Sequence, residues 1–215
     1  HSIVAVNKEC ILLIVSNPVD VLTYTALKAS GFPASRVIGT GTVLDTARLK
    51  YLVGEKLGVD YRNVHSFIIG EHGDSELAVW SGANVSGINI DDFCPLCDNC
   101  HRMSDLYELY DDVKNSAYEI IRGKGATYYA IAQATRRIIE AIMGDENSIL
   151  PVSVHLEGQY GLNDSCMSIP SIVGKGGVKH VLNIPLSDEE YAALMTSAAT
   201  LRQVILSLSE TYTTV

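Results

Sequence analysis

The strongest candidate for chemistry in this sequence is a histidine in a glycine-containing loop. His72 lies within Gly70-Glu-His-Gly-Asp-Ser75, directly after a predicted strand. The glycines let a ligand approach the backbone closely, and a histidine in such a place can act as a general acid or base near neutral pH. On its own, the segment is more typical of an ordinary surface loop, where histidines are common.

A second candidate is the pair of Asp45 and Arg48 in Leu44-Asp-Thr-Ala-Arg48. Residues three apart on a predicted helix project to one side of it. A surface ion pair, worth about 0–1 kcal/mol, is the simpler interpretation, but it leaves the apolar context unexplained. An arginine presented from a helix in an apolar setting suits a carboxylate ligand, because its planar fork makes two parallel hydrogen bonds.

Two further polar segments have structural explanations. Asn17 precedes Pro18, so it can cap a helix whose first position the proline occupies, and capping alone would account for it. The segment Gly39-Thr-Gly41 begins like a phosphate loop, but Leu44 stands where the third glycine of a dinucleotide fingerprint belongs. We therefore reject this segment as a dinucleotide-binding loop.

These residues are carried by one predicted parallel βα unit followed by a mixed α+β region. The continuous apolar run 10–15 is typical of a strand covered on both faces, and Gly31 and Gly58 are typical helix ends. Ser187 and Glu190 form a capping box that opens a last helix. Helices are predicted over residues 18–30, 43–57, 104–122 and 127–143, and strands over 10–15, 64–69, 77–80, 84–88, 149–156, 165–173 and 178–184.

The composition excludes several classes of protein. The 215 residues are 47% apolar and 19% charged, which is typical of a globular chain with a substantial core. A net charge of -9 disfavours nucleic acid as a partner. The longest apolar run is far shorter than the roughly 20 residues of a membrane-spanning helix, so we expect no membrane insertion. Five cysteines without a regular framework fit a reducing cytoplasm.

Three of the cysteines are clustered with a histidine, at Cys94, Cys97, Cys100 and His101. Paired CxxC steps can wrap one metal ion. The alternative is a surface loop whose cysteines pack together or oxidise. We favour this alternative and expect no metal ion, because no second cluster elsewhere completes a metal site.

Four motifs taken together resemble the L-lactate dehydrogenases in order and spacing. They are Ser16-Asn-Pro-Val-Asp20, Val43-Leu-Asp-Thr-Ala-Arg48, Gly70-Glu-His-Gly-Asp-Ser75 with Val79-Trp-Ser81, and Lys124-Gly-Ala-Thr127, continued by Leu150-Pro-Val-Ser153 and Gly158-Gln-Tyr-Gly161. The resemblance covers nearly the whole chain. It implies an α/β fold plus an α+β part: the remnant of a doubly wound parallel (Rossmann) sheet, ending a dinucleotide-binding domain in residues 1–40, and a mixed α+β catalytic, substrate-binding domain in residues 41–215.

The resemblance also implies a hydride-transfer site. His72 would donate the proton to the substrate carbonyl and take it back in the reverse reaction. Asp45 would orient the imidazole and stabilise its charged form. Arg48 would bind the substrate carboxylate through two hydrogen bonds.

Four more positions match residues around the substrate and the cofactor, which is NAD. Asn17 and Thr127 would border the substrate. Asn17, Thr40 and Ile131 would contact the nicotinamide end of the cofactor. Ala126 and Thr127 together favour, modestly, a substrate with a small methyl group.

The activity that the resemblance implies is the NADH-dependent interconversion of pyruvate and L-lactate, a step of glycolysis and fermentation. The partners would be a small 2-oxo or 2-hydroxy acid and further copies of the chain, in a cytoplasmic homotetramer or dimer. The alternatives are an L-malate or other L-2-hydroxy-acid dehydrogenase, and a non-catalytic assembly or metal-binding module.

The sequence departs from the family at its start and at one surface position. The family's glycine-rich turn, acidic ribose-binding residue and mobile substrate loop are expected upstream of His1, so we expect a C-terminal fragment that binds NADH poorly and turns over little or nothing. Bacterial members are often activated by fructose 1,6-bisphosphate through an arginine and a histidine. Lys50 and His65 stand at these positions, and lysine keeps the charge but loses the fork.

Overall fold

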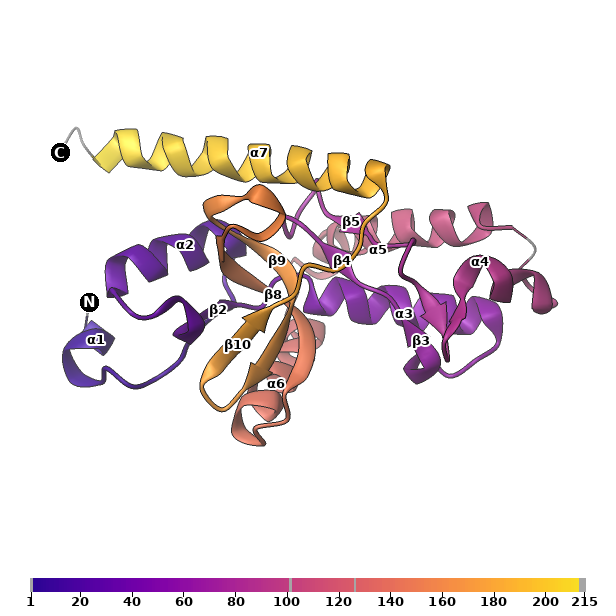
Figure 1. Cartoon of the computed structure of the whole chain (residues 1–215), viewed down its shortest axis with the longest axis horizontal. Coiled ribbons are helices and arrows are strands. Elements are labelled where there is room, and N and C mark those ends of the chain that lie inside the picture. Colours follow the sequence, from indigo (N-terminus) through magenta and orange to yellow (C-terminus); the bar gives the residue numbers. More distant parts are fainter. Residues whose placement is uncertain (1, 101, 126, 213–215) are drawn as a thin grey trace.

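A five-stranded mixed sheet lies at the centre of the computed structural model, which describes residues 2–100, 102–125 and 127–212 (Figure 1). Strands β1 (Leu12–Ile14) and β2 (Val37–Gly39) pair in parallel. Strands β8 (Ser148–Glu157), β9 (Asn163–Gly174) and β10 (Gly177–Val181) follow in the order β1-β2-β8-β9-β10 and are antiparallel. The predicted parallel unit and the predicted three-stranded antiparallel run are both confirmed.

The two parts of the sheet join at Gly39, which pairs with Ser153 of β8. A Cβ atom at Gly39 would lie 2.8 Å from the Ser153 Cβ and 2.4 Å from the Thr23 Oγ1. Only a glycine therefore lets helix α2 (Val19–Ser30) and strand β8 approach β2 this closely. This continuity of the sheet was not predicted, because the sequence pattern contains no signal for a pairing between segments so far apart.

The first strand differs from the prediction in its burial. Residues Leu12–Ile14 are half-buried along their whole length, whereas the continuous apolar run predicts a strand covered on both faces. In the part of the chain that the structure describes, β1 is the outer strand of the sheet, with β2 as its neighbour. An outer strand has one paired edge, so its side chains keep more contact with solvent.

Helix α2 (Val19–Ser30) starts one residue later than predicted. Its N-cap is Pro18, in an extended conformation with φ -72° and ψ 113°, and no side chain caps the helix. The Asn17–Pro18 peptide bond is cis. The predicted capping role of Asn17 and the placement of Pro18 in the first helical turn are therefore wrong, whereas Gly31 ends the helix in the left-handed conformation, as predicted.

The longer helices agree closely with the hydrophobic pattern. Helix α3 (Val43–Leu57) has the predicted bounds and ends at Gly58 with φ 69°. Ser187 and Glu190 make both hydrogen bonds of the capping box, at 2.9 Å and 3.2 Å, and open helix α7. The remaining helices are α1 (Ser2–Val6), α4 (Ile90–Phe93), α5 (Ser104–Lys124), α6 (Tyr129–Met143) and α7 (Asp188–Tyr212).

The predicted strand 64–69 is two strands that belong to different sheets. Strand β3 (Val64–His65) pairs with β6 (Asn84–Val85), which also pairs with β7 (Ile88–Asn89). Strand β4 (Ile68–Ile69) pairs with β5 (Leu77–Ala78). The chain changes partners between them, where the Val79 N–H donates to the Phe67 carbonyl at 2.8 Å.

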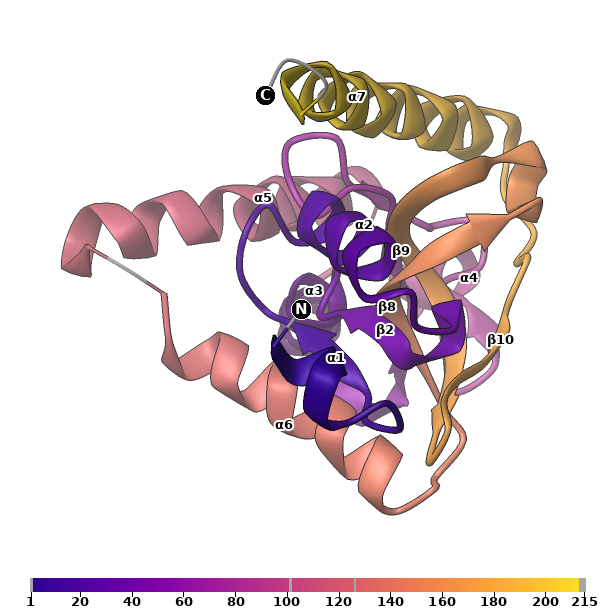
Figure 2. The same cartoon turned by 90° about the vertical axis from the view of Figure 1, so that its left-hand side faces the viewer.

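Two apolar cores hold these elements together. The first packs the central sheet against α6 and α7, which lie on opposite sides of the molecule in Figure 1 and Figure 2. The second packs α3 against α5 and the small sheet, with Leu49, Ile68 and Leu106 fully buried. Because helix α3 runs between the cores, its first turn is fixed from both sides.

The cysteine cluster belongs to the second core. Cys94 and Cys100 are buried and joined by a disulfide with a Cα–Cα distance of 5.2 Å, while Cys97 is a free, half-buried thiol. In this structure the three thiols are therefore not all free to act as ligands, and the expectation of no metal ion here stays a prediction. His101 lies outside the described residues. The disulfide also differs from the reduced thiols that a cytoplasmic chain would keep.

In the described residues, no helix is long and apolar enough to cross a bilayer.

Candidate active site

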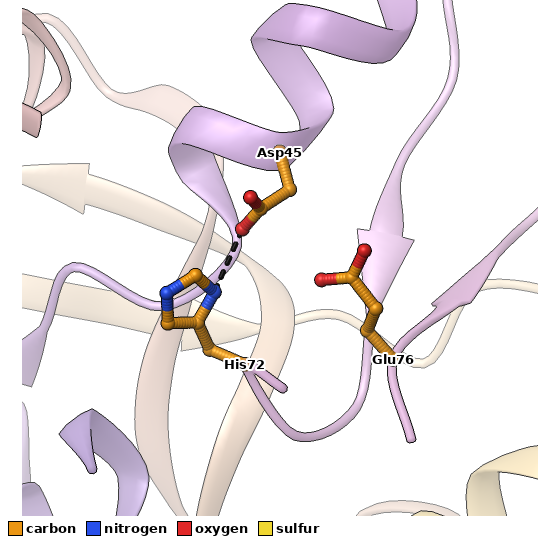
Figure 3. Close-up of side chains that lie close together, drawn as sticks. All are labelled: Asp45, His72 and Glu76. Atoms are coloured by element: carbon orange, nitrogen blue, oxygen red, sulfur yellow. Dashed lines mark ion pairs between the residues drawn. The ribbon is translucent and has the colours of Figure 1, made fainter. Parts of the chain in front are cut away.

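His72 and Asp45 form a close pair, as Figure 3 shows. The Nδ1 atom of His72 lies 2.7 Å from Asp45 Oδ2. Asp45 comes from the first turn of α3, and His72 comes from the loop between β4 and β5. Their side chains are 7% and 22% exposed, so the carboxylate is buried and the imidazole has access to a ligand. The segments that the sequence analysis singled out separately therefore meet in the fold.

The loop that carries His72 is fixed at its base. Strands β4 and β5 pair, and Gly70 exchanges two 2.9 Å hydrogen bonds with Ser168 of β9. Gly70 has φ 94°, and a Cβ atom there would lie 2.8 Å from the Ser197 Oγ. A glycine is therefore required where the chain leaves β4. Thr46 of α3 accepts a 2.9 Å hydrogen bond from the Ile68 N–H, which ties the Asp45 helix to the same strand.

Helix α2 contributes a second carboxylate to this site. Asp20 Oδ2 accepts a 2.7 Å hydrogen bond from the backbone N–H of His72. Burial raises the pKa of Asp20 to about 6, although the nearby Ser153 and the hydrogen bond from the His72 N–H act in the opposite direction. Sequence reasoning missed this role. The signal was present, since Asp20 closes the segment Ser16-Asn-Pro-Val-Asp20.

The surroundings of His72 favour its protonated form. Burial alone would lower the pKa of His72, but the hydrogen bond and negative charge of Asp45, with the charges of Asp20 and Glu76, raise it to about 9. At neutral pH the imidazole is therefore positively charged. A charged imidazole is a proton donor, and its pairing through Nδ1 leaves Nε2 for a substrate.

Arg48 completes the group. Its Nη1 atom lies 3.8 Å from Asp45 Oδ1 and donates a 2.8 Å hydrogen bond to the Ser116 Oγ on α5. Arg48 also lines a hollow of about 380 Å³ between α3 and α5. The larger hollow of about 500 Å³ beside His65 and Leu186 is lined by none of Arg48, Asp45 and His72. Neither hollow is lined by Asp45 or His72, so Arg48 is the one residue of the three that borders either of these two hollows.

Glu76 is a further site residue that sequence reasoning missed. It is 7% exposed, and one of its oxygens lies within 4.8 Å of both Asp45 and His72. Burial raises the pKa of Glu76 to about 8, and the negative charge of Asp45 adds to this effect. No motif indicated this residue, because its approach to His72 depends on the pairing of β4 with β5.

The residues expected around the substrate and cofactor are spread over several elements. Asn17 is exposed and follows β1, while Thr40 is buried and follows β2, where its N–H donates to the Ile14 carbonyl at 2.9 Å. Both thus lie at the carboxyl ends of parallel strands, where ligands bind in open α/β sheets. Ile131 lies on α6 and packs partly against the first core, and Thr127 is half-buried just before α6. Their roles stay predictions, and Ala126 lies outside the described residues.

Lys50 and His65 line one cavity of about 360 Å³, together with Arg137. Burial lowers the pKa of Lys50. Arg137 already pairs with Glu146 at 2.7 Å and donates to Ser148. The structure therefore brings the two expected residues together beside Arg137, and their role as a regulatory site stays a prediction.

Comparisons with known proteins agree with this fold. A family model described as the lactate/malate dehydrogenase alpha/beta C-terminal domain matches residues 42–211, and the corresponding NAD binding domain model matches residues 1–39. The chain belongs to the lactate/malate dehydrogenase family. This confirms the resemblance and the fold class inferred from the motifs.

The relatives are named as lactate dehydrogenases. The chain is 57% identical to the L-lactate dehydrogenase of Acetivibrio thermocellus over 97% of its length, and 55% identical to L-lactate dehydrogenase 1 of Clostridium acetobutylicum over 96%. Among solved structures, a lactate dehydrogenase from a Medee basin deep-sea metagenome library matches with a TM-score of 0.90 at 46% identity, covering 93% of this chain and 63% of that one. The minor L-lactate dehydrogenase of Enterococcus mundtii matches with a TM-score of 0.86 at 45% identity, covering 92% and 62%.

The chain spans 66% of the length of the Acetivibrio thermocellus relative and 66% of the length of the Clostridium acetobutylicum relative.

Proposed function

We propose that this chain is the catalytic part of an NAD-dependent L-lactate dehydrogenase, which interconverts pyruvate and L-lactate. The observation that carries the proposal is the convergence of His72, Asp45 and Arg48, with atomic separations of 2.7 Å and 3.8 Å. The reduction of a 2-oxo acid needs a proton donor for its carbonyl oxygen, and a neighbouring guanidinium group can bind its carboxylate.

His72 acts as the proton donor in this proposal. In its charged form it donates the Nε2 proton to the carbonyl oxygen of pyruvate as that oxygen gains negative charge. Asp45, 2.7 Å from Nδ1, holds the ring in place and stabilises the positive charge before transfer. In the reverse reaction the neutral imidazole accepts the hydroxyl proton of lactate.

Arg48 binds the carboxylate of the substrate. Its Nη1 atom is engaged by Ser116 and Asp45, which leaves Nη2 and Nε for two parallel hydrogen bonds to a carboxylate. Such a bidentate contact fixes the orientation of the substrate, so its carbonyl is presented to His72. Orientation of this kind supplies a large part of the acceleration in two-reactant chemistry.

NAD, when bound, supplies the hydride that reduces the carbonyl carbon. The residues present fit its nicotinamide end: Asn17 and Thr40 follow neighbouring parallel strands, and the side chain of Asn17 is exposed. The sequence contains no Gly-x-Gly-x-x-Gly segment for the pyrophosphate. We therefore propose that this chain alone binds NADH weakly and has little or no turnover.

The test of this proposal uses a hybrid enzyme, in which the chain follows the N-terminal third of the Acetivibrio thermocellus relative. We expect NADH-dependent reduction of pyruvate by the hybrid and little by the chain alone. Oxaloacetate and branched 2-oxo acids are compared in the same assay. Faster reduction of oxaloacetate would replace lactate by malate as the product, and no reduction of any 2-oxo acid would favour a non-catalytic assembly role.

Two further properties of the family are proposed for the whole protein. The cavity lined by Lys50, His65 and Arg137 would bind a sugar bisphosphate through its positive charges. The whole protein would be a cytoplasmic homotetramer or dimer, a state that light scattering of the hybrid measures directly.

A further inference from the structure

Glu76 is a buried carboxyl group for which the proposed mechanism has no use. It lies four residues after His72, just before β5. Its Oε1 atom has no hydrogen-bond partner within the described part of the chain. One oxygen of Glu76, one oxygen of Asp45 and one ring nitrogen of His72 all lie within 4.8 Å of one another (Figure 3). Burying a carboxyl oxygen without a hydrogen-bond partner costs stability, and an effect of this carboxyl group on the charge of His72 is a physical reason for its presence.

The backbone holds Glu76 in this position from two sides. Its N–H donates to the Gly73 carbonyl at 3.2 Å, within the loop that carries His72. Its carbonyl accepts a 2.6 Å hydrogen bond from the Tyr110 hydroxyl on α5. The carboxyl group is therefore kept beside His72 by the loop and by a neighbouring helix.

The charges around the two groups link their titrations. Asp45, Asp20 and Glu76 are the acidic groups that face His72. Asp45 faces Glu76 together with the cations His72, Lys114 and Arg48. Burial and Asp45 raise the pKa of Glu76 to about 8, against the effect of the three cations, and His72 has a pKa of about 9. At neutral pH, Glu76 is therefore neutral while His72 is charged.

We propose that Glu76 is a positioning residue that keeps His72 protonated in alkaline solution. As the pH rises, Glu76 ionises. The negative charge left behind stabilises the neighbouring imidazolium, so His72 holds its own proton to a higher pH than Asp45 and Asp20 alone would allow. The value of this to catalysis rests on the proposed function, in which charged His72 is the proton donor.

The first test measures the titration of His72 itself and needs no activity. The imidazole carbon and nitrogen signals of the 215-residue chain are followed by NMR from pH 5 to 11, and the His72 signal is assigned by its loss in His72→Asn. We expect a two-step titration in the native chain. In Glu76→Gln we expect one step with a midpoint lower by about one pH unit, the size of the effect of a unit charge at this distance.

Glu55→Gln is the matched control for this test. Glu55 lies on the exposed face of α3, where it accepts a 2.8 Å hydrogen bond from the Tyr51 hydroxyl, so His72 in its variant should titrate as in the native chain. A second variant, Glu76→Leu, replaces the carboxyl group by an apolar side chain of similar size. It should give the same lowered His72 midpoint and serves if Glu76→Gln does not fold. An unchanged His72 midpoint in a folded Glu76 variant would overturn the proposal.

The second test uses the hybrid enzyme. The alkaline limb of kcat/KM for pyruvate should move to lower pH by about one unit in Glu76→Gln and stay in place in Glu55→Gln. A limb that does not move, in a variant whose His72 midpoint has fallen, would contradict the role of Glu76 in catalysis. A lowered His72 midpoint together with no reduction of any 2-oxo acid by the hybrid would instead contradict the proposed function alone.

Discussion

The Ser116 hydroxyl on α5 accepts a 2.8 Å hydrogen bond from Arg48 Nη1 on α3. This contact joins the two helices. Ser116 in turn donates to the Val113 carbonyl at 2.8 Å, so its hydroxyl is fixed as an acceptor toward Arg48. The contact at Nη1 therefore orients the guanidinium group of Arg48, and Nη2 and Nε can donate to a carboxylate.

Replacing Arg48 by lysine tests the bidentate contact with the substrate. Lysine keeps the positive charge but cannot donate two parallel hydrogen bonds. In the hybrid enzyme, Arg48→Lys should lower kcat/KM for pyruvate by about 10- to 100-fold, the equivalent of one charge-assisted hydrogen bond. The dissociation constant of NADH, measured by fluorescence, should stay the same. An unchanged kcat/KM would remove Arg48 from the substrate site.

Replacing His72 by asparagine tests the proton donor. Asparagine can still donate a hydrogen bond but cannot transfer a proton. We expect kcat of the hybrid enzyme to fall by about 10²- to 10⁴-fold, with a smaller change in KM. The control is His180→Asn, because His180 is an exposed residue of β10. Comparable turnover of the two variants would show that His72 does not carry the proton.

The stability of the chain should fall as the pH rises from about 6.5 to 9. The pKa of His72 is raised from 6.5 to about 9, so its contribution is complete below pH 6.5 and is lost as the pH passes 9. Glu76 acts in the same direction, because its pKa is raised from 4.5 to about 8 and ionisation is disfavoured only in the folded state. Each retained proton contributes a slope of at most about 1.4 kcal/mol per pH unit.

Urea unfolding at several pH values measures this slope, and the double variant His72→Asn/Glu76→Gln is the control. The double variant should lose most of the dependence between pH 6.5 and 9. A native chain whose free energy of unfolding is constant over this range would show that neither group has the raised pKa.

Lys50 offers a test of the regulatory cavity. Fructose 1,6-bisphosphate should lower the apparent KM for pyruvate of the hybrid enzyme, because Lys50, His65 and Arg137 line one cavity and cationic side chains bind phosphate groups. Lys50→Gln should weaken this response by about tenfold in activator concentration, and Lys50→Arg, which restores the fork, should strengthen it. No response of the native hybrid at any activator concentration would remove the idea.

The sequence predicted those parts of the fold whose signals are local. Helix α3 has the expected bounds because Gly58 supplies a left-handed end, and α7 begins at a capping box whose two hydrogen bonds both form. The capping role of Asn17 was wrong, although its side chain and Pro18 fit the usual pattern for a helix start. The extended conformation of Pro18 makes this residue the N-cap, so the helix begins at Val19. Residue types alone do not predict that conformation.

The site could be predicted only where a motif carried it. His72, Asp45 and Arg48 were found through segments that resemble a known family. Glu76 has no such motif, and its place beside His72 depends on the pairing of Ile69 with Leu77 across the loop. Non-local pairing of this kind also divides residues 64–69 between two sheets. The hydrophobic periodicity of the sequence does not predict which strands will pair.

A last prediction concerns the joint between the two parts of the central sheet. Gly39→Ala would place a methyl group 2.4 Å from the Thr23 Oγ1 and 2.8 Å from the Ser153 Cβ, and both neighbours are fully buried. Overpacking of this kind costs about 1–3 kcal/mol, so the midpoint of urea unfolding should fall. Gly123→Ala is the matched control: nothing lies within 4 Å of its added Cβ, and alanine favours the helix by about 1 kcal/mol. Equal stability of the native chain and Gly39→Ala would mean that α2, β2 and β8 are less closely packed than their contacts at Gly39 require.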